Sequence, residues 1–78
     1  MSSLNPDVVV DVTGEICPIP LVEFRKAFLN AKKGNIILII GTHAPSKKEI
    51  PMAAEGAGAE VLKVEEEDGG LWRIFVRK

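Results

Sequence analysis

The sequence predicts an α/β fold, a two-layer sandwich in which a mixed four-stranded sheet carries two helices on one face. Three observations support this prediction. Stretches rich in β-branched residues alternate with stretches of helical periodicity, the stretch 36–40 is apolar throughout, and the chain closes with a β-hairpin pattern. The 78 residues suffice for one domain but not for two, so we expect residues 1–78 to form one domain.

The first predicted strand, 8–12, leads into a predicted helix that runs from Pro18 to about Lys33. The strand is rich in valine and ends at a Thr-Gly pair. In the helix, apolar residues recur at spacings of three and four positions, which places them on one face. These residues are Leu21, Phe24, Phe28 and Ala31. Gly34 follows at a position where a left-handed residue commonly ends a helix.

The second predicted strand, 35–40, has the nearly unbroken apolar character of a buried strand in a parallel pair. A right-handed crossover through the first helix would set the first two strands parallel. We expect Ile37 and Ile39 to lie on the sheet face that points away from the helices. If nothing covers them there, they mark the surface of a weak homodimer or of a partner protein.

The second predicted helix begins at Ser46-Lys47-Lys48-Glu49, which matches a capping box. In that motif two side chains bond the free amides at the start of a helix. Pro51 falls inside the helix and should kink it or delay its regular part. Gly58 is placed to end it.

The last two predicted strands, about 59–67 and 71–78, form a hairpin around Asp68-Gly69-Gly70. A three-residue loop sets Glu65 opposite Arg73, an opposite-charge match, and gives Gly70 the left-handed position that such loops need. A two-residue loop would mix polar and apolar residues on both faces. The apolar pairs expected from the three-residue loop are Leu62 with Val76 and Val64 with Ile74.

The charged residues are balanced, with 10 Lys and Arg against 11 Asp and Glu and a formal net charge of −1. Proteins that bind nucleic acid through its phosphates usually carry a marked basic excess, so we expect no direct nucleic-acid binding. The longest apolar run is too short to span a bilayer, and the first residues lack the pattern of a signal peptide. One cysteine allows no internal disulfide, and no Cys/His cluster has zinc-ligand spacing. We therefore expect a cytoplasmic protein without metal, cofactor or membrane partner.

Cys17, the only cysteine, is the candidate functional residue. It stands between a predicted strand and a predicted helix, before Pro18 and Pro20, which the first turn of a helix tolerates. A thiolate at this position accepts hydrogen bonds from free amides and faces the positive end of the helix dipole, which lowers the pKa of a thiol and favours nucleophilic chemistry. The loop that leaves a parallel strand is also where α/β folds place their sites. The alternative is a buried structural cysteine, since cysteine is among the most buried residue types.

The stretch Asp-Val-Thr-Gly-Glu-Ile-Cys-Pro-Ile-Pro at 11–20, followed by Arg25 and Lys26, resembles the signature of the TusA-like (SirA-like) sulfur carriers. The resemblance extends to Gly34, the strand 36–40, Ile50-Pro51 and the closing Arg77-Lys78, and so covers nearly the whole chain. It is specific, because a glycine, a Cys-Pro-x-Pro motif and a basic pair occur together at one strand–helix junction. The resemblance implies the same βαβαββ two-layer fold.

The resemblance also implies a function. In that family the motif cysteine takes sulfane sulfur as a persulfide from a donor such as a cysteine desulfurase or rhodanese. It passes the sulfur to an acceptor, for example in tRNA thiolation, sulfur oxidation or cofactor assembly. For this chain the resemblance implies a sulfur carrier without turnover of its own, with Cys17 as the persulfide-forming nucleophile. It further implies that three residues are structural supports, namely Gly14, Pro18 and Pro20. It also implies that Arg25 and Lys26 are docking or electrostatic residues.

The loop after the second strand departs from the family pattern, which commonly has an acidic pair there. Here the stretch reads Gly41-Thr42-His43-Ala44-Pro45. The loop leaves the same sheet edge as Cys17, so His43 could approach the thiol and favour the thiolate. The alternative is a solvated loop histidine. A loop without acids, followed by two lysines, should also select different partner surfaces.

Two other functions compete with the carrier. A thiol-based redox or regulatory module is the first, although an oxidoreductase of the thioredoxin type would need a second cysteine in a Cys-x-x-Cys motif. An RNA-binding module is the second, and it would require a basic face with exposed aromatic residues. The chain has few aromatic residues and no basic excess.

Overall fold

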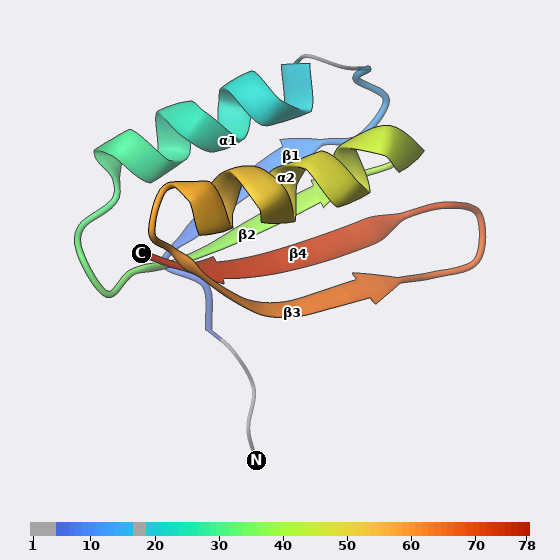
Figure 1. Ribbon diagram of the computed structural model, residues 1–78. Coiled ribbons are helices and arrows are strands. Elements are labelled where there is room, and N and C mark those ends of the chain that lie inside the picture. The colour runs from blue at the N-terminus through green and yellow to red at the C-terminus, as the bar shows by residue number, and fades with distance from the viewer. Residues whose placement is uncertain (1–4, 17–18) are drawn as a thin grey trace.

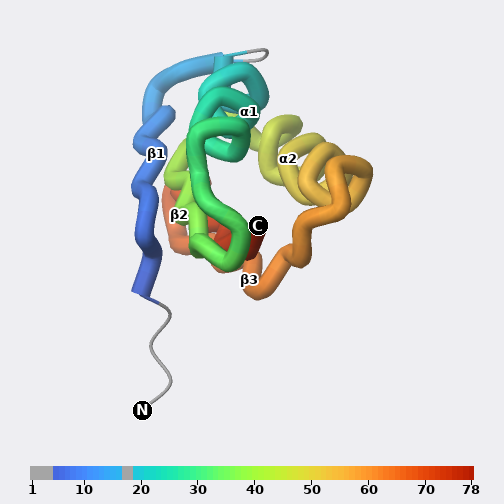
Figure 2. Tube along the Cα trace, turned by 90° about the vertical axis from the view of Figure 1, so that its left-hand side faces the viewer, coloured from blue at the N-terminus to red at the C-terminus, as the bar shows by residue number. Residues whose placement is uncertain are grey.

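The computed structural model describes residues 5–16 and 19–78, which form four strands and two helices in the order βαβαββ (Figure 1). The elements are β1 (Val8–Val12), α1 (Ile19–Asn30), β2 (Ile36–Gly41), α2 (Ala44–Gly56), β3 (Glu60–Glu66) and β4 (Trp72–Arg77). The sheet order is β1-β2-β4-β3, with β1 parallel to β2 and the other neighbours antiparallel. Both helices lie on one face of the sheet (Figure 2). The predicted fold class is confirmed.

The core lies between the helices and the sheet. Its largest fully buried side chains come from α1, β2, α2 and β4, namely Phe24, Ile37, Ile39, Ile50, Trp72, Ile74 and Val76. The expectation that Ile37 and Ile39 point away from the helices is therefore wrong. The register with β4 sets these two residues opposite Val76 and Ile74, which are also buried. Because β2 is apolar on both faces, its own pattern could not show which face meets the helices. Because both side chains are buried in the core, they do not form the predicted dimer or partner surface.

The end of α1 differs from the prediction. The helix ends at Asn30 rather than at about Lys33. The N–H of Asn35 donates to the carbonyl of Lys32 (2.9 Å), and the side chain of Asn35 accepts from the N–H of Lys32 (2.8 Å). Gly34 has the predicted left-handed conformation, φ +93°, but it lies within this turn and not at the helix cap. A local turn closed by Asn35 thus competes successfully with a further helical turn.

The start of α2 also differs. The helix begins at Ala44 with His43 as N-cap, two residues before the predicted capping box, so that prediction is wrong. Pro45 lies in the first turn, where its fixed backbone angle suits a helix start. Ser46 is buried within the helix, and its hydroxyl lies 3.0 Å from Nδ1 of His43. The helix continues through Pro51.

Gly58 ends α2 as expected. It has φ +86°, and its N–H donates to the carbonyl of Glu55 (3.0 Å). The N–H of Ala59 donates to the carbonyl of Ala54 (2.9 Å). These two bonds form a Schellman motif, which satisfies the last carbonyls of a helix.

The β3–β4 hairpin has the predicted three-residue loop, with Gly70 at φ +86° and the N–H of Glu67 donating to the carbonyl of Leu71 (2.7 Å). The pairs of Glu65 with Arg73 and of Val64 with Ile74 are confirmed. The pair of Leu62 with Val76 is wrong. The register shifts between Val61 and Lys63, so that Val61 pairs with Val76. A β-bulge inserts one extra residue into a strand. The alternation of polar and apolar residues around Leu62 does not predict this bulge.

Candidate functional site

The carboxyl ends of β1 and β2 and the first residues of α1 and α2 meet at one edge of the molecule (Figure 1). Val12 and Gly41 form the last register pair of the two parallel strands. The β1–α1 loop begins after Val12, and the β2–α2 loop begins after Gly41. Cys17 and Pro18 belong to the first of these loops by sequence but lie outside the described residues. The predicted approach of His43 to the Cys17 thiol therefore stays a prediction.

The β1–α1 loop begins with a compact turn. The N–H of Glu15 donates to the carbonyl of Val12 (3.1 Å), and Gly14 has φ +82°, a conformation that favours glycine. Asp11 accepts from both the N–H (3.0 Å) and the hydroxyl (2.7 Å) of Thr13. Both bonds lower the pKa of the Asp11 carboxyl, and the bond from the N–H has the larger effect. On the far side of Cys17, the N–H of Ile19 donates to the carbonyl of Ile16 (2.9 Å).

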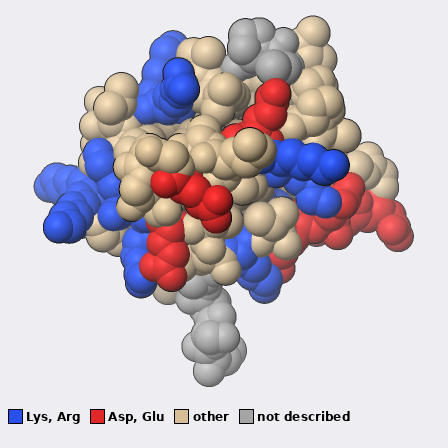
Figure 3. Space-filling model, viewed as in Figure 1, with Lys and Arg blue, Asp and Glu red and all other residues tan. Residues whose placement is uncertain are grey.

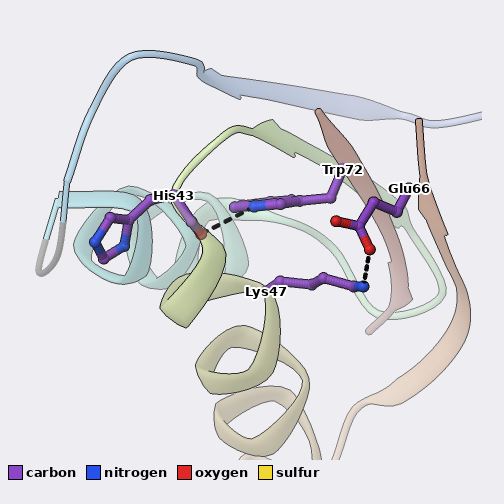
Figure 4. Close-up of polar contacts among 4 residues, drawn as sticks. All are labelled: His43, Lys47, Glu66 and Trp72. Carbon is purple, nitrogen blue, oxygen red and sulfur yellow. Dashed lines mark hydrogen bonds and ion pairs between the residues drawn. The ribbon is translucent and has the colours of Figure 1, made fainter. Parts of the chain in front are cut away.

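The β2–α2 loop is held by side chains from β4 and α2. The indole Nε1 of Trp72 donates to the carbonyl of His43 (2.9 Å), as Figure 4 shows, while the imidazole of His43 contacts Ser46. Trp72 is fully buried. Its ring lies against Gly41, where a Cβ would stand 2.6 Å from two ring carbons. An ion pair between Lys47 and Glu66 further joins α2 to β3 (Figure 4).

The hydroxyl of Thr42 connects the two loops. Its Oγ1 accepts from the N–H of Gly14 at 3.0 Å. In the sequence, Thr42 stands out only as part of a loop that departs from the family pattern, and this bond was not predicted. A pattern within one chain segment carries no information on a bond between residues 28 positions apart, so no sequence signal could have found it.

The starts of α1 and α2 lie at the same end of the molecule, and a helix start presents the positive end of the dipole. The end of β1 and the β1–α1 loop also carry the carboxylates of Asp11 and Glu15. Among the described residues, neither helix has an acidic side chain in its first turn. An anionic group near either helix start would therefore be stabilised without a competing carboxylate from that turn.

Of the predicted docking residues, Arg25 and Lys26 are exposed on α1. Lys26 forms an ion pair with Glu23 (3.6 Å). Arg25 lines an apolar groove of about 500 Å³ between α1 and α2, together with Phe24, Phe28, Leu29, Ala53, Gly56 and Ala57. Arg25 is six residues beyond the first helical residue, about 9 Å along the axis. The structure therefore places the basic pair in the middle of α1, on the surface, with Arg25 near the C-terminal end of α2.

Exposed apolar side chains flank the motif on both sides, which the sequence analysis missed. Ile16 is 65% exposed, and Ile19 and Val22 are each 41% exposed. Val22 falls outside the core stripe of α1. An apolar residue at such a position is a sequence signal for an exposed apolar surface. Pro20, a predicted support, is buried.

Other kinds of site find no support in the described residues. Residues 5–16 and 19–78 contain no group of three His, Cys, Asp or Glu side chains that could hold a metal ion. No described helix is both long and apolar enough to cross a membrane. On the face that Figure 3 shows, basic and acidic side chains are interspersed rather than gathered into a basic surface.

Comparisons with known proteins agree with this arrangement. The family profile described as Sulfurtransferase TusA matches residues 8–78. The sulfur carrier protein TusA of Pseudomonas putida (strain GB-1) is 31% identical over 78 residues, which cover 100% of this chain and 96% of that protein. A provisionally named sulfur carrier protein of Thermotoga maritima is 38% identical over 77 residues, covering 99% of this chain and 98% of that one.

The fold has a counterpart among solved structures. The crystal structure of a SirA-like protein from Desulfitobacterium hafniense matches with a TM-score of 0.78, covering 90% of this chain and 95% of that chain. At 24% identity, this likeness supports the fold alone. The family profile and the full-length relatives carry the assignment: the chain belongs to the TusA family.

Proposed function

We propose that this chain is a sulfur carrier that holds sulfane sulfur as a persulfide on Cys17 and passes it from a donor protein to an acceptor protein. The observation that carries the proposal is the match of residues 8–78 to the TusA family, whose full-length relatives are named sulfur carriers. Those names favour a carrier over a classical enzyme. The chain has a single cysteine, and it lies in the Cys-Pro-x-Pro motif of the resemblance.

Loading on Cys17 is an exchange between a thiolate and a persulfide. The Cys17 thiolate attacks the terminal sulfur of a persulfide on the donor's cysteine, a new S–S bond forms, and the donor's S–S bond breaks. The donor cysteine leaves as a thiolate and takes the proton that Cys17 released. The sulfur moves without net oxidation or reduction, so the step needs no cofactor.

The position of Cys17 in the sequence supports this chemistry, because it stands two residues before the first residue of α1. A thiolate or persulfide anion near a helix start is stabilised by the helix dipole. In the proposed site Gly14, Pro18 and Pro20 support the loop and the helix start. Arg25 and Lys26 contact the partners, and His43 acts as a loop residue whose ring contacts Ser46.

The proposed partners are a cysteine desulfurase or rhodanese-like donor and a sulfur-acceptor protein, both in the cytoplasm, and residues 1–78 act as one carrier domain. Exposed Ile16, Ile19 and Val22 would give these partners an apolar contact around the motif. The exposed basic pair on α1 would attract acidic partner surfaces.

The test is mass spectrometry of the intact protein after incubation with a cysteine desulfurase and cysteine, or with rhodanese and thiosulfate. We expect a gain of one sulfur atom that Cys17→Ser abolishes. The melting temperature of Cys17→Ser should stay close to that of the wild type, because serine caps a helix at least as well as cysteine. If the variant instead loses much of its stability, Cys17 is a packing residue.

A matched control separates a special cysteine from any exposed thiol. Lys33→Cys in the Cys17→Ser background has one thiol, at an exposed position beyond the other end of α1. It should load far more slowly than the wild type. Equal loading of the two thiols, or no loading of Cys17 by any donor, would overturn the proposal. A disulfide-linked dimer in place of the sulfur adduct would favour a redox module.

A further inference from the structure

We infer that Thr42 is a positioning residue for sulfur transfer: its hydroxyl anchors Gly14 and so fixes the β1–α1 loop that carries Cys17. The anchor itself is a hydrogen bond between described residues. Its consequence for sulfur transfer rests on the proposed function.

The acceptor side of this bond is held in place before the bond forms. Thr42 lies between Gly41, which is packed beneath the Trp72 ring, and His43, whose carbonyl accepts from the Trp72 indole (2.9 Å). His43 is also the N-cap of α2 and contacts Ser46 through its ring (3.0 Å). Figure 4 shows the indole reaching this loop from β4. Both neighbours of Thr42 are thus held by the core, and the backbone of Thr42 is held with them.

The donor side is a turn whose other hydrogen bonds between described residues are local. The bond from Glu15 to Val12 and the bonds from Thr13 to Asp11 all stay within β1 and its own loop. The bond from Gly14 to Thr42 instead joins this turn to the neighbouring loop. It therefore sets the direction in which the chain leaves the turn, three residues before Cys17.

The anchor is suited to orientation rather than to global stability. Gly14 and Thr42 are both exposed, so water can replace the bond when it is lost, and the net contribution of such a bond to stability is small. Only four residues separate Gly14 from Ile19, the first described residue of α1. In so short a segment, fixing one end restricts where the intervening thiol can lie relative to the helix start. Loss of the anchor should therefore reduce thiol reactivity while the fold stays intact.

The experiment compares Thr42→Val, which removes the hydroxyl, with Thr42→Ser, which keeps it. First, amide hydrogen exchange followed by NMR should show faster exchange of the Gly14 N–H in Thr42→Val, with wild-type protection in Thr42→Ser. Second, the rate of alkylation of Cys17, the only thiol, is measured against pH. We expect Thr42→Val to lower the alkylation rate at neutral pH by about two- to tenfold and to shift the profile to higher pH. Sulfur loading by the donor should slow by a similar factor, with the melting temperature nearly unchanged.

Thr13→Val is the matched control. It removes the same hydroxyl from the other threonine of the chain, closer in sequence to Cys17, but leaves the bond from the Thr13 N–H to Asp11 and the Thr42 anchor in place. Its pH profile should stay close to that of the wild type. Equal alkylation and loading rates in wild type and Thr42→Val would overturn the inference, as would equal losses in Thr13→Val and Thr42→Val. If wild-type protein alkylates but never loads, the proposed function fails while the alkylation comparison still tests the anchor.

Discussion

Trp72 connects the packing of the core to the geometry of the edge. Its ring is buried against Gly41, and its indole N–H donates to the carbonyl of His43. A buried tryptophan with a satisfied N–H contributes both a large apolar surface and a directional bond. Gly41 is not among the residues with positive φ, so its backbone does not require glycine. The Trp72 ring requires it, because the ring occupies the space of a side chain.

Gly41→Ala should therefore destabilise the protein. The added Cβ would stand 2.6 Å from two carbons of the Trp72 ring and 3.1 Å from a methyl carbon of Val12. Such overpacking of a core typically costs about 1–3 kcal/mol of the free energy of unfolding. Urea denaturation followed by Trp72 fluorescence measures this loss.

Gly56→Ala is the control for this prediction. Gly56 is the last residue of α2, its φ is not positive, and a Cβ there meets nothing within 4 Å. Since alanine favours a helix more than glycine does, the free energy of unfolding should rise by up to about 1 kcal/mol. An equal loss in both variants would show that the Trp72 contact is not the cause.

At the scale of elements, the C-terminal end of α1 depends on a distant side chain. Nζ of Lys78 donates to the carbonyls of Phe28 (2.6 Å) and Ala31 (2.9 Å) and lies 4.9 Å from the centre of the Phe28 ring. Free carbonyls and the negative end of the dipole make a helix end a favourable place for an ammonium group. The β4 side of the fold thus stabilises the end of the helix whose start follows Cys17.

Lys78→Met should remove this cap while keeping much of the apolar side-chain stem. We expect the free energy of unfolding to fall by about 1–2 kcal/mol, as measured by urea denaturation. Lys33→Met is the control, because it removes an exposed positive charge close to the same helix end. If both variants lose the same stability, net charge and not the Lys78 contacts accounts for the effect.

The sequence predicted the elements whose signals are local. Three of these signals lie within short stretches of the chain. They are the valines of β1, the apolar stripe of α1 that includes Phe24, and the three-residue hairpin loop with Gly70. The buried face of β2, which the sequence did not predict, is chosen by its register with β4, a strand far along the chain. The start of α2, also missed, involves a local contact instead, because Ser46 bonds to His43 rather than capping the helix.

The candidate site divides in the same way. Sequence could single out Cys17, because the Cys-Pro-x-Pro motif is contiguous. It could not find Thr42 as the partner of Gly14, nor Trp72 as the donor to His43, because each bond joins residues that are close only in the folded chain. To the nucleophile proposed from the sequence, the structure therefore adds contacts of the two neighbouring loops.

At the scale of the whole molecule, the two-layer arrangement brings both helix starts to one edge. β1 and β2 are parallel and adjacent, and each leads into a helix on the same face, so α1 and α2 both begin at the same end of the molecule (Figure 1). The rest of the sheet, β4 and β3, completes the core beneath them. The loops after β1 and β2 therefore lie at the end of the molecule where both helices begin.

A carrier must release its sulfur as well as accept it, and the release step tests the account most directly. Wild-type protein is loaded, separated from the donor and mixed with an excess of a small acceptor thiol, and both products are followed by mass spectrometry. If Cys17 is a carrier site, the acceptor thiolate attacks the terminal sulfur, the acceptor gains one sulfur atom and the protein returns to its unloaded mass. Attack at the inner sulfur would instead release hydrosulfide and leave a mixed disulfide on Cys17. That result, or a sulfur adduct that never leaves, would contradict the account.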